Sequence, residues 1–382
     1  MKCEKLLNTI RELNDEYLDV LEDVCNIESP TDFKEGVDAV GTYFAERAKR
    51  KGWKVEIFRQ NVAGDVVCIT LNPDAAAAPI SISGHIDTVH PVGLFGKPAV
   101  KRDGTRMYGP GVADCKGGVV AGFMAMDALE KCGFTARPVR LLIQTDEEKG
   151  SSISNKETIK YICAKSLGSV AFLNLECGTK GFAVLSRKGI LRYSFTVHGK
   201  ACHSSRCNEG ANAVREAAYK IIALEEMKDP AGLTCNCGVI NGGSVANTVA
   251  EECRFTADIR FATEEQAEEA RRRVNEIAQK TVVEGCSCTV EELSYRPMME
   301  KAKRNYDLLD KMNEIYEENG LSVLKPIDAL GGSDAAYATE YGIPCVDSVG
   351  AEGGKIHSSG EYIEMSSISE SAGRIATVIY CI

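Results

Sequence analysis

Positive charge and long apolar runs are both scarce in this sequence. The 382 residues include 45 lysines and arginines against 55 aspartates and glutamates, a formal net charge of −10. This excess of acid argues against binding to nucleic acid or to anionic membrane surfaces. No apolar run is long enough to span a bilayer, and the acidic N-terminal stretch lacks the uninterrupted apolar core of a signal peptide. We therefore expect a soluble cytoplasmic protein.

Cys-x-x-Cys pairs are absent, although the chain has 16 cysteines. Two pairs are spaced Cys-x-Cys instead, Cys235 with Cys237 and Cys286 with Cys288. A zinc site with four thiolates typically uses the longer spacing. Most of the cysteines stand among apolar neighbours at strand or helix periodicity, so we expect buried thiols without a chemical role.

Internal repeats and low-complexity tracts are also absent, and the first half of the chain alternates between helical and extended patterns. An early helix should contain Tyr17 and Val24 and stop before Pro30. Further helices are expected over residues 34–51 and 117–133, and strands over residues 53–58, 65–71, 78–89 and 137–148. This alternation is typical of an α/β fold.

From about Lys188 the pattern changes to strict alternation of apolar and polar residues. The segments "ILRYSFTVHG" and "ECRFTADIRFA" both alternate in this way, as half-exposed antiparallel strands do. Two helices, over about residues 210–227 and 263–281, interleave with the strands, and "CSCTVEEL" closes the set. The resulting order is that of a ferredoxin-like split βαβ sandwich. We predict an inserted domain over residues 188–296, with residues 1–187 and 297–382 forming one discontinuous domain.

Three adjacent carboxylates, Asp146, Glu147 and Glu148, follow the apolar stretch "VRLLIQ". Neighbouring carboxylates repel one another, and the free-energy cost rises where water is excluded, unless a cation or a proton compensates. The run is therefore either a solvated turn or part of a metal site.

Other histidines and acids stand at the ends of apolar runs. His85 and Asp87 in "SGHIDTV" are two residues apart on an extended segment, so both side chains leave the same face. This spacing suits a metal ligand whose imidazole donates to a carboxylate, although a core histidine paired with an acid has the same spacing. Asp114 stands just before an expected helix, Glu176 ends an apolar run, and His357 lies near the C-terminus. The glycine-rich "GPGVADCKGG" lacks the ending of a phosphate-binding P-loop.

Seven segments together resemble a known family. "SGHIDTV", "GPGVADCKGG", "TDEEKGS", "NLECGT", "GKACHSS", "GGSDAAYA" and "IHSSGEY" stand in the order found in the dinuclear zinc peptidases and deacylases. That family includes glutamate carboxypeptidase, aminoacylase, acetylornithine deacetylase and succinyl-diaminopimelate desuccinylase, and the resemblance is closest to the first. It implies a zinc-dependent exopeptidase-like catalytic domain with a central mixed sheet, and an inserted lid and dimerisation domain.

The resemblance implies two zinc ions per chain, bridged by Asp114 and by a water or hydroxide. His85 and Glu176 would complete one site, and Glu148 and His357 the other. Two divalent cations would compensate the acidic cluster. Nitrogen and oxygen ligands fit zinc, and cobalt or manganese can substitute for it.

The resemblance also assigns catalytic roles. Glu147 would be the general base, and Asp87 the partner that orients His85. The histidine of "GKACHSS", His203, would donate to the oxyanion from the partner subunit of a homodimer. From the residues alone, His203 reads as a surface histidine in a polar turn.

Substrate binding is implied for a further set of residues. Arg260 matches the family arginine that clamps a substrate carboxylate, and arginine suits this role because its planar fork binds both oxygens. Pairing of Arg260 with Asp258, two residues earlier on the same strand face, is an equal alternative. Asn247 matches a nearby donor. The segment "GGSDAAYA" places Gly331, Gly332 and Ser333 before an expected helix start, where backbone N–H groups are well placed to bind an anion.

The implied function is a metal-dependent hydrolase that cleaves the amide bond next to a C-terminal amino acid carboxylate of a small peptide. An N-acyl amino acid deacylase of the acetylornithine deacetylase or desuccinylase type is the alternative. A metal-binding relative without catalysis is more remote, because a binding protein needs no general base at Glu147.

Overall fold

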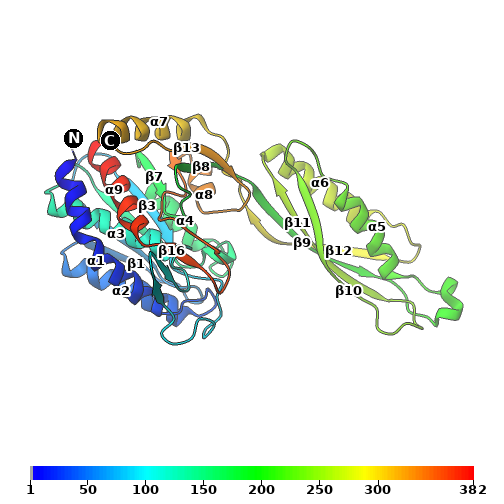
Figure 1. The fold of residues 1–382 in the computed structure, drawn as a ribbon. Coiled ribbons are helices and arrows are strands. Elements are labelled where there is room, and N and C mark those ends of the chain that lie inside the picture. The colour runs from blue at the N-terminus through cyan, green and yellow to red at the C-terminus, as the bar shows by residue number, and fades with distance from the viewer. Residues whose placement is uncertain (1–2) are drawn as a thin grey trace. The chain divides into compact units, whose positions relative to one another are not determined.

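The chain forms two structural units, each with its own hydrophobic core. The computed structural model describes residues 3–382 (Figure 1). The larger unit contains the chain up to Ser186 together with Lys301–Asp328 and Ser333–Ile382. The smaller unit contains Arg187–Glu300 and the short segment Ala329–Gly332. The inserted domain predicted from the sequence spans 188–296.

A six-stranded mixed sheet lies at the centre of the larger unit, with the strand order β1-β2-β6-β3-β7-β14. The β1–β2 and β2–β6 pairs are antiparallel, and the remaining pairs are parallel. The strands are β1 (Lys54–Phe58), β2 (Val66–Leu71), β6 (Val139–Gln144), β3 (Ile80–His85), β7 (Ala171–Asn174) and β14 (Cys345–Val346). The residues of β2, β3 and β7 are all buried, because helices cover both faces of the sheet. The predicted α/β class is confirmed.

Helix α3 packs on one face of this sheet, and α1 and α9 pack on α3 (Figure 1). Helices α4 and α8 pack on each other and on other strands of the sheet. The helices are α1 (Glu4–Asn26), α2 (Lys34–Arg50), α3 (Lys116–Lys131), α4 (Glu157–Ser166), α7 (Lys303–Glu318), α8 (Ala335–Glu340) and α9 (Ser366–Cys381). Gly52 and Gly133 follow α2 and α3 at φ of +77° and +76°, a conformation that ends a helix at little cost for glycine. The predicted ends of both helices therefore agree with the structure to within two residues.

Two short sheets complete the larger unit. One pairs β8 (Phe182–Arg187) with β13 (Lys325–Ala329). The other has the order β15-β16-β5-β4 and contains β4 (Lys101–Asp103), β5 (Arg106–Tyr108), β15 (Gly353–Gly354) and β16 (Tyr362–Glu364). The second sheet brings a C-terminal segment beside residues some 250 positions earlier, because β16 pairs with β5.

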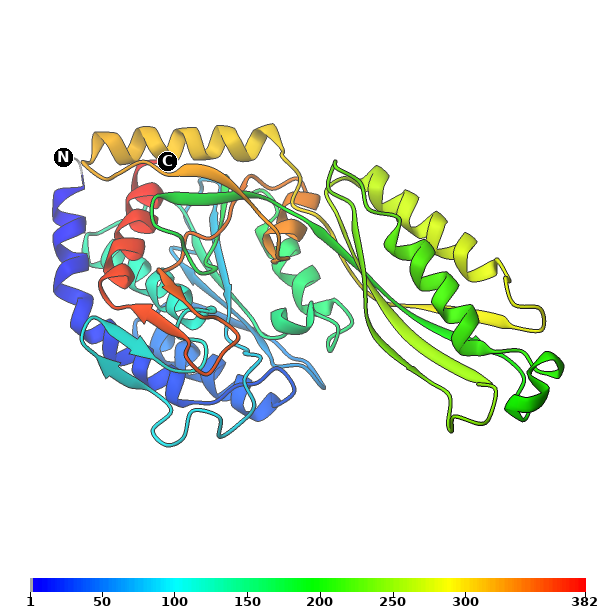
Figure 2. The ribbon, with the colours of Figure 1, turned by 45° about the vertical axis from the view of Figure 1, so that its right-hand side comes forward.

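The smaller unit is an antiparallel sheet of order β10-β11-β9-β12 with α5 and α6 side by side on one face (Figure 2). Its elements are β9 (Gly189–His198), α5 (Ala213–Glu225), β10 (Thr234–Gly242), β11 (Glu252–Phe261), α6 (Glu264–Gln279) and β12 (Ser287–Arg296). This order along the chain is the predicted one. The helix expected from residue 210 begins at Ala213, because Asn212 caps it and a 3₁₀ helix (Ser204–Glu209) precedes it.

Within residues 3–382, no helix combines the length and the apolar composition that crossing a bilayer requires. The same residues contain all 16 cysteines and no disulfide.

Candidate metal centre

The carboxyl ends of the parallel strands β3, β6 and β7 carry most of the candidate ligands. His85 is the last residue of β3, Glu147 and Glu148 begin a 3₁₀ helix (Glu147–Lys149) just after β6, and Glu176 follows β7. Asp114 lies two residues before the first residue of α3. Because parallel strands end at one edge of a sheet, these side chains converge there.

Asp114 lies between two histidines. Its Oδ1 is 3.1 Å from Nε2 of His85, and its Oδ2 is 3.1 Å from Nε2 of His357. His85 Nε2 is also 3.8 Å from Oε1 of Glu176, and His357 Nε2 is 3.2 Å from Oε2 of Glu148. The five side chains therefore form two groups that share Asp114, each with one imidazole and one further carboxylate.

These distances fit a pair of metal sites. Two ligand atoms bound to one tetrahedral zinc ion at ~2.1 Å lie about 3.4 Å apart, close to the separations found here. The ligand atoms of His85, Asp114 and Glu148 all lie within 4.8 Å of one another. Nitrogen and oxygen donors of this kind suit zinc.

Cys115 is a second neighbour of His85, and its thiol lies within 4.8 Å of the His85 and Glu176 ligand atoms. Its Sγ accepts the backbone N–H of His85 at 3.2 Å. Burial raises the pKa of the Cys115 thiol to about 12, so the thiol stays protonated and is a poorer ligand than the carboxylates.

Two acids of the centre, Glu148 and Glu176, have raised pKa values. At Asp114, in contrast, burial is outweighed by the hydrogen bonds to His357 and His85, which lower its pKa. Burial, reinforced by the charges of Asp114 and Glu147, raises the pKa of Glu148 to about 7. Burial likewise raises the pKa of Glu176 well above its usual range. Hydrogen bonds to Asp114 and Glu148 raise the pKa of His357 to about 10. Binding of a divalent ion to these groups would release protons and would therefore depend on pH.

Asp87 connects the end of β3 to the turn that carries the two glutamates. It is fully buried, and its carboxylate accepts the backbone N–H of Glu147 at 3.2 Å and of Glu148 at 3.1 Å. The hydroxyl of Thr31 donates to it as well, at 2.9 Å. The ring Nδ1 of His85 lies 3.0 Å from the main-chain oxygen of Asp87 and 3.4 Å from its carboxylate. The nearer acceptor for the ring is thus the carbonyl, rather than the carboxylate expected from the sequence.

Close packing at Gly118 sets the position of Glu176. A Cβ at residue 118 would lie 1.9 Å from the carbonyl oxygen of Leu175, so only glycine allows α3 to approach this strand end. His357 has a φ of +60°, unusual for a residue other than glycine. Such conformations persist where the surrounding structure fixes them, and they concentrate at functional sites.

Two buried residues near the centre were not among the sequence candidates. His90 Nε2 lies 2.7 Å from Oε2 of Glu361, and the Glu361 carboxylate also accepts the backbone N–H of Asp114 at 3.0 Å. The only sequence signal for Glu361 was its place in the segment "IHSSGEY", which also contains His357.

His203 and Asn247 lie together in the smaller unit. The backbone N–H of Ser204 donates to the carbonyl of Asn247 at 2.9 Å. His203 and Asn247 are both exposed. Nδ1 of His203 lies 2.8 Å from the hydroxyl of Ser205.

Arg260 lies at the other end of the same sheet. Glu252 of β11 pairs with His198, close to the His203 loop, whereas Arg260 pairs with Ile190. Eight residues of strand separate these ends, or about 26 Å at ~3.3 Å per residue. The structure therefore does not bring His203 and Arg260 of one chain together.

Asp258 holds two arginines. Arg260 Nε donates to its Oδ1 at 2.6 Å, and Arg192 Nη2 donates to its Oδ2 at 2.8 Å. The pairing considered as the alternative role for Arg260 is thus present. Two guanidinium groups share one carboxylate, so the group keeps a net positive charge.

The turn at residues 331–333 is divided between the units. Gly331 and Gly332 belong to the smaller unit, and Ser333 belongs to the larger one. The buried hydroxyl of Ser333 donates to Oδ2 of Asp347 at 2.6 Å and accepts the backbone N–H of Ala335 at 3.3 Å. Its side chain therefore stabilises the start of α8.

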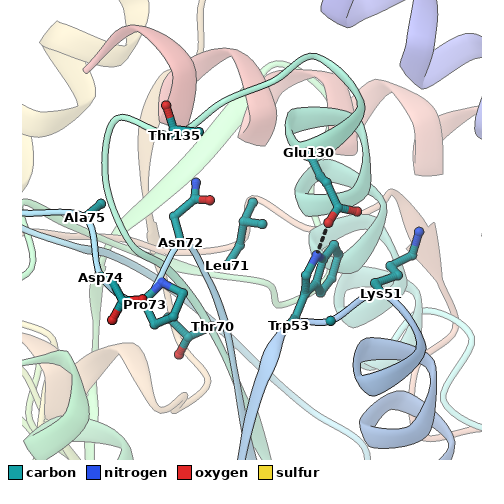
Figure 3. A pocket seen from close by; sticks show the side chains of 11 residues that line it. Lys51, Trp53, Thr70, Leu71, Asn72, Pro73, Asp74, Ala75, Glu130 and Thr135 are labelled. Atoms are coloured by element: carbon teal, nitrogen blue, oxygen red, sulfur yellow. Dashed lines mark hydrogen bonds between the residues drawn. The ribbon is translucent and has the colours of Figure 1, made fainter.

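A pocket elsewhere on the larger unit contains none of these residues (Figure 3). Leu71, which lines it, pairs with the first residue of β6, whereas His85 pairs with the last, so the pocket and the centre lie at opposite edges of the sheet. Trp53 in its wall donates through Nε1 to Oε1 of Glu130 at 2.7 Å.

Comparison with known proteins yields relatives that cover most of the chain. A family model described as peptidase family M20/M25/M40 matches residues 81–380. Carboxypeptidase G2 of Pseudomonas sp. (strain RS-16) is 29% identical over 355 residues, which cover 91% of this chain and 85% of that protein. Succinyl-diaminopimelate desuccinylase of Nitrosospira multiformis is 26% identical over 379 residues, with 90% and 92% covered.

Solved structures share the fold. Aminopeptidase PepT from Bacillus cereus aligns with a TM-score of 0.77 at 19% identity, over 96% of this chain and 98% of that one. An M20 family metallo-carboxypeptidase from Sulfolobus solfataricus aligns with a TM-score of 0.73 at 17% identity, with the same coverage.

Proposed function

The chain belongs to peptidase family M20/M25/M40, and from this premise we propose that it is a dinuclear zinc carboxypeptidase that cleaves the amide bond before a C-terminal amino acid. Membership makes it a metal-dependent hydrolase of the peptidase and deacylase class. The observation that carries the proposal is the position of Asp114, whose two oxygens each lie 3.1 Å from a different imidazole. A carboxylate so placed can bridge two ions.

Asp114 and the four side chains around it would hold the ions. When bound, these would lower the pKa of a coordinated water from ~15.7 toward ~7 and polarise the scissile carbonyl. Glu147 would take up the proton at its carboxylate and return it to the leaving nitrogen. Its side chain is buried, and its backbone is fixed by Asp87, so the base would be held in place before substrate binds.

Arg260 would select for a free C-terminal carboxylate. Arg260 and Arg192 both pair with Asp258, so two positive charges meet one negative charge. The remaining positive charge supports binding of a substrate carboxylate. Substrates would be small peptides, as the similarity to carboxypeptidase G2 favours. The similarity to the desuccinylase keeps an N-acyl amino acid deacylase as the second candidate, since its substrates can offer the same carboxylate.

His203 would act from the partner subunit of a homodimer. A small substrate held by Arg260 is too short to reach His203 of the same chain, because His203 follows the far end of the sheet and the strand between the two ends is about 26 Å long. The partner subunit's His203 could donate to the oxyanion instead. Exposed apolar side chains on α5, Tyr219 and Ile222 among them, supply a surface suited to association through this unit.

A substrate panel tests the proposal. Dipeptides with free and with amidated C-termini, and N-acetyl and N-succinyl amino acids, are incubated with chelator-treated protein before and after addition of zinc. We expect zinc-dependent cleavage of the dipeptides with a free carboxylate. Faster cleavage of acyl amino acids would favour the deacylase, and equal cleavage of free and amidated dipeptides would contradict the carboxylate clamp.

We further infer a cytoplasmic location, because a reducing compartment would suit a chain with 16 cysteines.

A further inference from the structure

We propose that Glu361 is a positioning residue that fixes the bridging carboxylate of Asp114 relative to His357. The inference rests on the proposed metal site, and it concerns a side chain that is itself no ligand. Glu361 is completely buried, so its role must be carried by its protein contacts.

Both oxygens of the Glu361 carboxylate are used to hold the loop that ends at Asp114. Oε1 accepts the backbone N–H of Ala113 at 2.9 Å and of Asp114 at 3.0 Å. Oε2 accepts the backbone N–H of Gly111 at 3.2 Å and lies 2.7 Å from Nε2 of His90. One side chain thus satisfies three buried donors of this loop, which come from residues about 250 positions earlier in the chain.

The same short segment carries His357. Glu361 follows it by four residues in the connection between β15 and β16, and the backbone N–H of Glu361 donates to the carbonyl of Ser358 at 3.1 Å. The next residue, Tyr362, pairs with Tyr108 of β5, and the carbonyl of Glu361 accepts the N–H of Gly109 at 3.4 Å. Glu361 therefore joins the loop of the bridging acid to the loop of one imidazole.

A carboxylate is needed for this geometry. A glutamine has one acceptor oxygen, so its amide nitrogen would face either the N–H of Gly111 and His90 or the N–H groups of Ala113 and Asp114. Donors facing donors are forced apart, and a buried donor left without an acceptor costs free energy. The loop should then shift, and the shift moves Asp114 away from the position in which both of its oxygens meet an imidazole.

Metal binding tests the role directly. Metal-free protein is titrated with cobalt(II), and the absorption spectrum and the dissociation constants of the two ions are measured for wild type and Glu361→Gln. We expect the weaker-bound ion to dissociate at least tenfold more readily from the variant, with an altered cobalt spectrum. Asp127→Asn is the matched control, because Asp127 is also a buried carboxylate, bonded to Tyr17 and Lys51 at 2.8 and 2.7 Å. Asp127 lies in α3, about 16 Å along the helix from its first residue.

Thermal unfolding of the metal-free proteins separates positioning from general stability. Both variants should unfold at a lower temperature than wild type, but only Glu361→Gln should lose cobalt affinity. Cobalt constants and spectra equal to wild type in folded Glu361→Gln would overturn the inference, and so would an equal loss in Asp127→Asn. If wild type itself bound no cobalt, the result would contradict the proposed metal site, and not specifically the role of Glu361.

His90→Leu covers the case in which Glu361→Gln does not fold. It removes one donor to Oε2 and leaves the three backbone contacts in place, so we expect a smaller loss of cobalt affinity, of two- to fivefold. An unchanged constant in that variant would then count against the role of the Glu361 group.

Discussion

Glu148 and His357 meet at the candidate metal centre, with 3.2 Å between Oε2 of the acid and Nε2 of the imidazole. Glu147, the preceding residue, is held by the same Asp87 carboxylate but has a different expected role. Substituting each glutamate in turn should therefore distinguish their two roles.

We predict that Glu147→Gln keeps its metal and loses activity, whereas Glu148→Gln loses metal. Loss of a general base typically lowers the rate by roughly 10² to 10⁴. Elemental analysis after dialysis and the kcat of both variants check this. Equal metal loss in the two variants would show that the roles within the pair are assigned wrongly.

Local patterns predicted the strand ends well. The apolar runs before His85, Asp146 and Glu176 are buried strands, and their carboxyl ends converge as an α/β sheet requires. A buried run of apolar residues followed by an acid is a signal that a single sequence contains.

Local sequence patterns could not predict contacts between distant segments. Nothing in the spacing near Glu361 reveals that it accepts the N–H of Asp114, 247 residues earlier. The hydroxyl of Ser333 bonds to Asp347 for a similar reason: the bond depends on how a turn packs, and this is set by the tertiary structure.

We predict that Arg260→Ala raises the KM for substrates with a free carboxylate by roughly tenfold or more, since a charged hydrogen bond contributes about 1.5–3 kcal/mol. Arg192→Ala is the matched control, because Arg192 binds the same Asp258 and would remove an equal charge. We expect a smaller rise in KM for Arg192→Ala. Equal effects of the two substitutions would mean that the charge of the cluster, and not a clamp at Arg260, determines binding.

The buried pair of Glu216 and Lys220 gives the smaller unit a dependence on pH. Their charged atoms lie 3.0 Å apart, and Glu216 also accepts the backbone N–H of Val282 and Val283. Burial acts to raise the pKa of Glu216, but the hydrogen bonds from Val283 and Lys220 outweigh it and lower the pKa. The resulting stability is present above the unfolded pKa of about 4.3 and is lost as the pH falls through the folded pKa.

We therefore predict that Glu216→Gln lowers the free energy of unfolding by about 1–3 kcal/mol at pH 7. The difference from wild type should shrink as the pH falls below the unfolded pKa of about 4.3, because protonation then favours the unfolded chain until the lower folded pKa of Glu216 is reached. Urea unfolding at pH 7, 5 and 3.5 measures it. Glu269→Gln, at a partly exposed position of α6 where the acid pairs with Arg272, should change little at any pH. A difference that stays constant down to pH 3.5 would rule out this source of the pH dependence.

The separation of His203 from Arg260 within one sheet leads to the last prediction, which concerns exchange between subunits. We expect His203→Ala to lower kcat by roughly 10² to 10³ with its metal content unchanged, as loss of an oxyanion donor does.

Mixed dimers then distinguish donation between subunits from donation within one. When His203→Ala and Glu147→Gln chains exchange at random, about a quarter of all sites should combine an intact Glu147 with the partner's His203. A chain with both substitutions, mixed equally with wild type, is the matched control: donation between subunits leaves about a quarter of the sites active, and donation within a chain leaves about half. Mass spectrometry must first show that the subunits have exchanged. No recovery in the first mixture together with half activity in the second would place His203 over the metals of its own chain and would contradict donation between subunits.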